Sequence, residues 1–299
     1  MIKIANAPCS WGVLEFDLEG ETYSYSRVLD EIKDTGYEGT EFGDWGFMPT
    51  EPDRLRDELQ KRGLELVGAF VPVFFADPRE HRKGRDLALK TARLLHAAAG
   101  EAPLIILADD NCKDPVRTRH AGRITQEMQL SQEQWHYFTE GVMSTAKAVR
   151  EETGLQCVFH HHCGGFIETP AEVEYLMAQT DPELLGLCLD TGHFLFGGGD
   201  PVQAFKTYRS RIRHIHFKDC DLRVREQAAR EEWDYFQAVR QGIFCPLGEG
   251  GVDFPGIVDE IRRSGYRGWI VVEQDVLPGM GAPKLYARKN REYLRQFDL

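Results

Sequence analysis

The sequence has no apolar run long enough to cross a membrane, because none approaches the roughly 20 residues that a spanning helix needs. Its first residues, 1–8, read directly as a strand and carry no signal-peptide pattern. The seven cysteines include no CxxC pair, and two of them, Cys157 and Cys188, fall in strand-like runs where a small buried side chain is expected. We therefore predict reduced thiols and a cytoplasmic protein.

Positive charge is also scarce, since 36 Lys and Arg face 48 Asp and Glu, for a net charge of −12. Nucleic acids and anionic membrane surfaces both favour basic proteins, so we expect neither as a partner. A chain of 299 residues can bury about 75% of its unfolded surface and needs no disulfide to fold. A small uncharged polyol remains compatible with this composition.

Strand-like and helix-like segments alternate along the whole chain, which is typical of βα units around a parallel sheet. The first strand leads into NAPCSWG, which lacks the GxGxxG spacing of an open dinucleotide-binding sheet. No linker or low-complexity tract interrupts the pattern. The sequence predicts an α/β protein with one (β/α)8 TIM barrel domain over residues 1–299, whose strands are 2–7, 39–43, 64–71, 103–108, 155–160, 184–190, 213–217 and 269–273. The expected helices are 25–36, 52–63, 88–100, 131–154, one after Thr169-Pro170, one after Asp200-Pro201, 254–265 and 283–297.

Histidine and acidic residues stand at the ends of four of these apolar runs. They are His160 or His162 in CVFHHHCGG, Asp190 in LGLCLDTGH, His216 in IRHIHFKD and Glu273 in GWIVVEQD. The carboxyl ends of barrel strands all meet at one face, where active sites lie. Imidazole and carboxylate ligands together suit Mn²⁺, Co²⁺, Fe²⁺ or Zn²⁺. The pattern therefore predicts an enzyme with a divalent-metal site, and we expect Mn²⁺ or Co²⁺ first.

Side-chain alternation divides the histidines further. His160 and His162 share one face of their strand, while His161 points the other way. One of the pair is expected to be the ligand and the other a substrate contact or an acid–base group. His214 and His216 also share a face, and His216 is the better ligand because it lies nearer the strand end.

Each acidic or cationic candidate also has an ordinary structural interpretation. Asp190 could cap a helix instead of binding metal, whereas Glu273 ends an apolar strand, where a carboxylate is costly unless it is paired or bound. His193 could hold a substrate hydroxyl. Lys218 could stabilise an oxyanion or form a surface salt bridge. Glu41 could anchor substrate or pair with an arginine.

The first strand ends in an amide, a hydroxyl and an indole, supplied by Asn6, Ser10 and Trp11. Two hydrogen-bonding groups beside an apolar ring suit a polyol. The alternative is a packed loop in which the tryptophan has an internal partner.

With these motifs in view, the chain resembles the xylose-isomerase-like TIM-barrel superfamily of sugar isomerases and epimerases, and within it the family of inosose dehydratases. The resemblance rests on ANAPCSWGVLEF, GYEGTEFG, FHHHCGGFIET, LDTGH, HIHFKD, FQAVRQGIFCPLGEGGVDF and GWIVVEQD. It implies a metal held by four side chains, of which Asp190, His216 and Glu273 match the superfamily pattern. His160 takes the place of a glutamate that epimerases use. An asymmetric His and Glu pair suits one-way elimination better than epimerisation.

The resulting hypothesis is a metal-dependent lyase that dehydrates a 2-keto-polyol or cyclitol, such as 2-keto-myo-inositol, through a metal-stabilised enediolate. Glu273 or a histidine would remove the α-proton, and His160, His162 or His193 would protonate the leaving hydroxyl. This activity would belong to myo-inositol catabolism. The alternatives are a ketose or sugar-phosphate epimerase or isomerase on the same metal, a DNA-repair endonuclease, and a non-catalytic sugar-binding barrel. Homo-oligomers are common among such barrels.

Overall fold

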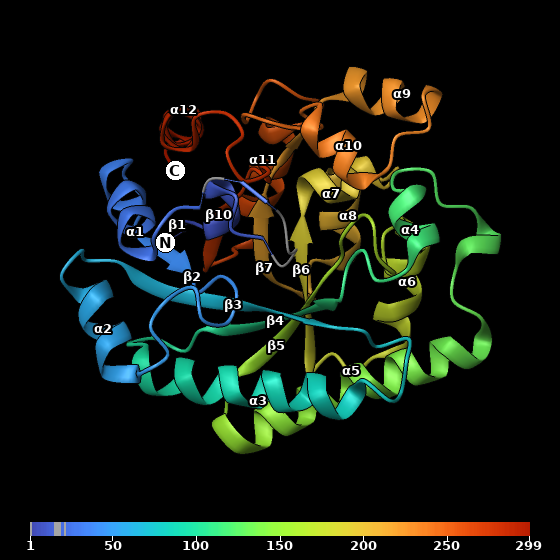
Figure 1. Ribbon diagram of the computed structural model, residues 1–299, viewed down its shortest axis with the longest axis horizontal. Coiled ribbons are helices and arrows are strands. Elements are labelled where there is room, and N and C mark those ends of the chain that lie inside the picture. Colours follow the sequence, from blue (N-terminus) through green and yellow to red (C-terminus); the bar gives the residue numbers. More distant parts are fainter. Residues whose placement is uncertain (1, 15–18, 21) are drawn as a thin grey trace.

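The computed structural model describes residues 2–14, 19, 20 and 22–299. Eight parallel strands hydrogen-bond side by side and close into a barrel, in the order β1-β10-β7-β6-β5-β4-β3-β2 (Figure 1). The barrel strands are β1 (Lys3–Asn6), β2 (Gly39–Glu41), β3 (Glu65–Val73), β4 (Leu104–Asp109), β5 (Gln156–His160), β6 (Leu185–Asp190), β7 (Ile212–Phe217) and β10 (Trp269–Val272). The predicted (β/α)8 barrel is therefore confirmed.

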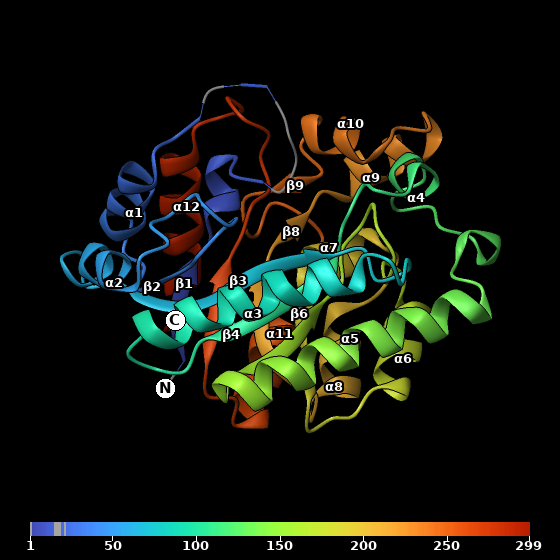
Figure 2. The ribbon, with the colours of Figure 1, turned by 60° about the horizontal axis from the view of Figure 1, so that its bottom comes forward.

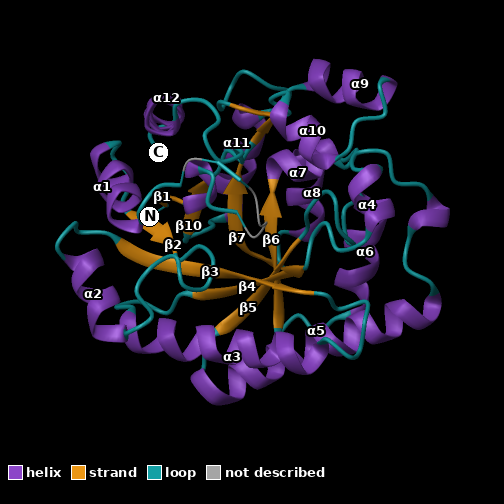
Figure 3. Cartoon of the chain, viewed as in Figure 1, coloured by secondary structure: helices purple, strands orange, loops and turns teal. Residues whose placement is uncertain are grey.

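A helix follows each barrel strand, and together these helices form the outer ring around the strands (Figure 3). They are α1 (Tyr25–Asp34), α2 (Pro52–Gln60), α3 (His81–Ala98), α5 (Gln132–Thr153), α6 (Pro170–Gln179), α8 (Pro201–Tyr208), α11 (Phe254–Ser264) and α12 (Pro283–Arg295). The largest difference from the sequence prediction is α3, which begins at residue 81 and not at residue 88. Its first two turns are mainly polar, so the apolar periodicity used for the prediction did not reveal them. None of the described helices is both long and apolar enough to span a membrane.

The helix boundaries follow from local capping chemistry. The Ser131 hydroxyl accepts a hydrogen bond from the Gln134 backbone N–H at the start of α5, and Gly154 ends that helix with φ of 73°. At the start of α6, Thr169 and Glu172 cap each other reciprocally. These caps fix where each helix begins, and so fix the loops at the carboxyl ends of the strands.

The long segment after β7 is folded. It contains an antiparallel pair, β8 (Asp219–Cys220) and β9 (Phe244–Cys245), and two helices, α9 (Leu222–Arg230) and α10 (Tyr235–Arg240). Together with α4 (Pro115–Arg119), which follows β4, these helices gather at one side of the barrel (Figure 2). Short helices also follow β1 and β6, namely η1 (Pro8–Trp11) and α7 (Thr191–Phe196), and a further one, η2 (Gln126–Met128), precedes α5. The carboxyl ends of the strands are thus covered by several short elements.

Candidate metal centre and active site

Four side chains from four strand ends converge inside the barrel mouth. His160 ends β5, Asp190 ends β6, His216 lies near the end of β7, and Glu273 directly follows β10. All four are buried, and each offers a ligand atom within 4.8 Å of those of the other three. Barrel closure produces this arrangement, because strand pairing sets Asp190 beside His216 in register. Residues separated by more than a hundred positions therefore form one group.

The atoms of this group fit a bound cation. The Nδ1 atom of His216 lies 3.1 Å from the nearer carboxylate oxygen of Glu273 and 3.8 Å from Oδ2 of Asp190. The Nε2 atom of His160 lies 3.5 Å from the same Asp190 oxygen. Among the described residues, Oδ2 of Asp190 and Nδ1 of His216 are buried and accept or donate no hydrogen bond. Two imidazoles and two carboxylates suit a first-row divalent metal.

Asp190 caps a helix, which is one of the two roles that its sequence context suggested, and its second carboxylate oxygen remains available to a cation. Its Oδ1 atom accepts a 2.7 Å hydrogen bond from the His193 backbone N–H and so caps α7. Its Oδ2 atom is left pointing at the other members of the group. The backbone N–H of Asp190 donates to Nε2 of His161, whose side chain does not line the cavity that His160 and His162 share.

Glu41 binds the ring nitrogen of His216 that lies opposite Asp190 and Glu273. Its Oε1 atom accepts hydrogen bonds from Nε2 of His216 at 2.9 Å and from Nε2 of His214 at 2.7 Å. Burial would raise the pKa of Glu41, but the two histidines outweigh it and bring the pKa to about 2. A ligand histidine usually donates its second N–H to such a carboxylate, which leaves its other nitrogen for the metal. Glu41 therefore pairs with histidines and not with an arginine.

Lys218 is buried beside these four candidate metal ligands and not at the surface. Its Nζ lies 2.9 Å from Asp275, 3.2 Å from Glu273 and 3.4 Å from Asp190. Burial would lower the pKa of Lys218, but these three carboxylates outweigh it and raise the pKa well above the usual value. Burial would likewise raise the pKa of Glu273, whereas His216 and Lys218 hold it well below its usual range. Lys218 is therefore a protonated ammonium, and the Glu273 beside it is an ionised carboxylate.

His162 and His193 belong to a neighbouring cluster. The Nδ1–H of His162 donates to the Cys163 carbonyl at 2.6 Å, so its Nε2 atom carries the lone pair. Burial lowers the pKa of His162 to about 3 and keeps the ring neutral. The Nε2 atom of His193 lies 3.3 Å from Asp275, and its Nδ1 atom accepts from the Cys163 backbone N–H.

Tyr235, from the long segment after β7, completes this cluster. Its hydroxyl lies 3.4 Å from Asp275 and 3.5 Å from Nε2 of His162. Neither Tyr235 nor Asp275 was predicted from the sequence as a site residue. Asp275 could have been found, since it lies two residues after Glu273 in the same polar strand end. No sequence signal marks Tyr235.

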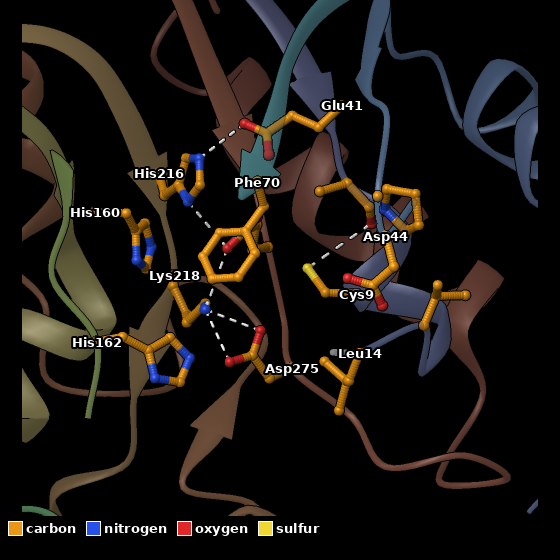
Figure 4. Close-up of a pocket in the computed structure, with 15 residues that line it drawn as sticks. Cys9, Leu14, Glu41, Asp44, Phe70, His160, His162, His216, Lys218 and Asp275 are labelled. Carbon is orange, nitrogen blue, oxygen red and sulfur yellow. Dashed lines mark hydrogen bonds and ion pairs between the residues drawn. The ribbon is translucent and has the colours of Figure 1, made fainter. Parts of the chain in front are cut away.

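Seven of these side chains line one cavity: Glu41, His160, His162, His216, Lys218, Glu273 and Asp275. Figure 4 shows the three histidines His160, His162 and His216 on one side of the cavity and Asp44 on the other. Lys218 and Asp275 lie between them in this view. The remaining wall is mainly apolar and is formed by Ala7, Pro8, Cys9, Val13, Leu14, Gly43 and Phe70.

Five residues expected at the active site are buried but do not line this cavity: Asn6, Ser10, Trp11, Asp190 and His193. The Ser10 hydroxyl accepts from the Gln274 backbone N–H, and the Asn6 side chain accepts from the next backbone N–H. Trp11 is 1% exposed, and its indole N–H donates to Glu31 at 2.7 Å. The packed-loop interpretation is therefore the one the structure gives for these first three residues. The last two residues of the ANAPCSWGVLEF motif, 15 and 16, lie outside the described residues.

Comparison with known proteins agrees with this architecture. The model of the xylose isomerase-like TIM barrel family matches residues 29–297. An inosose dehydratase of Geobacillus kaustophilus (strain HTA426) is 33% identical over 297 residues, which cover 98% of this chain and 93% of the relative. The rhizopine catabolism protein MocC of Rhizobium meliloti is 34% identical over 301 residues, covering 98% and 87%.

Among solved structures, a probable 3-DHS dehydratase, AsbF of Bacillus anthracis, superposes with a TM-score of 0.70 and 17% identity, covering 98% of each chain. An L-ribulose 3-epimerase gives the same TM-score with 15% identity, covering 99% of this chain and 94% of the other. At such low identity these structures support the fold alone. Since the family model spans most of the sequence and full-length relatives exceed 30% identity, the chain belongs to the xylose isomerase-like TIM barrel family.

Proposed function

We propose that this protein is a metal-dependent hydro-lyase that removes water from a 2-keto cyclitol such as 2-keto-myo-inositol. The observation that carries the proposal is the buried group of His160, Asp190, His216 and Glu273, with ligand atoms left unpartnered, beside a protonated lysine. The inosose dehydratase relatives, which match nearly the whole chain, support the choice of reaction. Such a reaction would serve the breakdown of inositol-type compounds.

The four side chains would hold one divalent ion, and Mn²⁺ or Co²⁺ suits this mixed donor set best, with Zn²⁺ and Fe²⁺ as further candidates. When bound, the ion would act as a Lewis acid toward the ketone oxygen and make the neighbouring C–H more acidic. Glu41 would orient His216 toward the ion, because it takes up the other ring N–H.

Glu273 would remove the α-proton. Its carboxylate lines the cavity and stays ionised, since His216 and Lys218 hold its pKa well below the usual range. A carboxylate kept deprotonated and facing the substrate cavity is an available proton acceptor, which general base catalysis requires.

Lys218 would protonate the leaving hydroxyl, in preference to the histidines suggested by the sequence. His162 faces the cavity but carries no proton on Nε2 at neutral pH, because its pKa is about 3. Lys218 keeps its proton and lies in the cavity wall. A departing hydroxide is the conjugate base of water, whose pKa is about 15.7, so proton transfer from an ammonium is favourable.

His162 and His193 would then have supporting roles. The lone pair of His162 Nε2 would accept a hydrogen bond from a substrate hydroxyl. His193 contacts Asp275, which in turn holds Lys218, so His193 would position the acid without touching the substrate. We retain a cytoplasmic location and a homo-oligomeric state as predictions.

The test is proton NMR of 2-keto-myo-inositol after incubation with the protein and a divalent metal in D₂O. Paramagnetic Mn²⁺ is removed before the spectrum is recorded, or diamagnetic Zn²⁺ is used instead. A parallel incubation with EDTA is the control. We expect a dehydrated dione that forms only with the metal. Deuterium incorporation or a new stereoisomer without loss of water would identify an epimerase instead and refute the hydro-lyase proposal.

A further inference from the structure

Asp44 is the one acidic side chain of the cavity wall without a partner among the residues that the structure describes. The other acids are engaged: Glu41 bonds to two histidines, Glu273 faces His216 and Lys218, and Asp275 pairs with Lys218. Within the described ranges, the Asp44 side chain makes no hydrogen bond and no ion pair. Its carboxylate is therefore left for whatever enters the cavity.

The surroundings of Asp44 make this lack of a partner costly. The residue lies in the loop after β2 and is half-buried, and the nearby cavity wall is apolar, with Pro8, Val13, Leu14 and Phe70. Burial alone raises the pKa of Asp44 to about 6. Burying a polar group without a hydrogen bond is unfavourable. A ligand that supplies a donor would relieve this cost.

The distribution of positive charge limits what that ligand can be. Lys218 is the only lysine or arginine among the described residues that line the cavity, and three carboxylates already surround it. A phosphate or carboxylate on the substrate would therefore find no free lysine or arginine in the cavity wall and would face the charge of Asp44. An uncharged hydroxyl meets no such penalty.

We infer that Asp44 determines substrate specificity: its carboxylate accepts a hydrogen bond from a ring hydroxyl on the side of the substrate away from the metal ligands, and its charge excludes phosphorylated or carboxylated rings. This inference rests on the proposed function and specifies its substrate class as neutral polyhydroxy ketones. In Figure 4 the three histidines lie on one side of the cavity and Asp44 lies on the other. A substrate ring between them would therefore face the histidines with one edge and Asp44 with the opposite edge.

The experiment compares wild type with Asp44→Asn and Asp44→Ala, using 2-keto-myo-inositol as substrate. We expect KM to rise about tenfold for the asparagine variant and further for the alanine variant, with kcat within about threefold, since the contact is remote from the reacting carbons. Bound metal per protein should be unchanged, which would show that the fold and the metal group are intact. Asp53→Asn, an exposed carboxylate outside the cavity, is the matched control.

Charge discrimination is measured separately with two inhibitors, myo-inositol and myo-inositol 1-phosphate. The wild type should bind the neutral compound more tightly, and Asp44→Asn should reduce the ratio of the two inhibition constants about tenfold. A KM within twofold of wild type together with an unchanged ratio would overturn the inference.

Failure of this inference can be distinguished from failure of the proposed function. A wild type that dehydrates 2-keto-myo-inositol while Asp44→Asn behaves identically would overturn the inference alone. A wild type that binds the compound by calorimetry with Asp44-dependent affinity, but produces no dione, would refute the hydro-lyase proposal and support the inference. A wild type that neither binds nor converts it would contradict both.

Discussion

Replacement of Glu41 should weaken metal binding although Glu41 is not itself a ligand. Its Oε1 atom accepts from Nε2 of His216 at 2.9 Å and so leaves Nδ1 of that ring facing Asp190 and Glu273. Hydrogen bonds to a charged group contribute about 1.5–3 kcal/mol, roughly twice the value for neutral pairs. Glu41→Gln keeps an acceptor oxygen but loses the charge, so the expected cost is about 1.4 kcal/mol, or tenfold in metal affinity.

Glu41→Ala removes the acceptor altogether, and the cost should approach about 100-fold, the upper end for groups that orient a metal ligand. The assay is a Mn²⁺ titration of the apo-protein against a competing chelator, with circular dichroism to verify folding. Asp275→Asn is the matched control, because Asp275 is another buried carboxylate of the same cavity but makes no hydrogen bond to His216. Equal metal affinity in wild type and both Glu41 variants would refute the role of Glu41.

Three further predictions follow from other contacts. Asp275→Asn should lower kcat about 100-fold with metal affinity within twofold of wild type, because it removes the closest anion from Lys218; unchanged kcat in steady-state assays would argue against Lys218 as the acid. Burial raises the pKa of Asp109 to about 7, above its unfolded value, so its contribution to stability is fully present at low pH and is lost as pH rises toward 7. In the wild type, this effect should lower the free energy of unfolding by up to about 3 kcal/mol between pH 5 and 8, and Asp109→Asn should abolish that decrease. The measurement is urea unfolding with EDTA present, and the same pH dependence in wild type and variant would contradict this. Trp11→Phe should cost about 1 kcal/mol of stability by losing the bond to Glu31 but leave KM within twofold, and a large rise in KM would restore Trp11 as a substrate contact.

The barrel and the strand-end residues could be predicted because both depend on local periodicity. An apolar run that stops in Asp190 or Glu273 places those carboxylates at a strand end in any parallel barrel. Closure then brings such ends together whatever their separation in sequence. The choice between His160 and His162 could not be made in this way, since alternation puts both on one face, and only the fold sets His160 beside Asp190.

The features that could not be predicted depend on partners distant in sequence. Tyr235 reaches Asp275 only because the segment after β7 folds back over the barrel mouth. The sequence predicted Trp11 as an apolar contact for a polyol, but its indole N–H donates to Glu31, twenty residues away on α1. The assignment of Lys218 as the acid likewise depended on tautomer and burial, which keep His162 neutral.

The most direct test of the metal centre is anomalous diffraction at the manganese edge from crystals grown with Mn²⁺. We expect one strong peak bounded by His160, Asp190, His216 and Glu273. A peak beside His162, His193 and Asp275 instead, or no peak in protein that dehydrates 2-keto-myo-inositol, would contradict the central role of these four side chains.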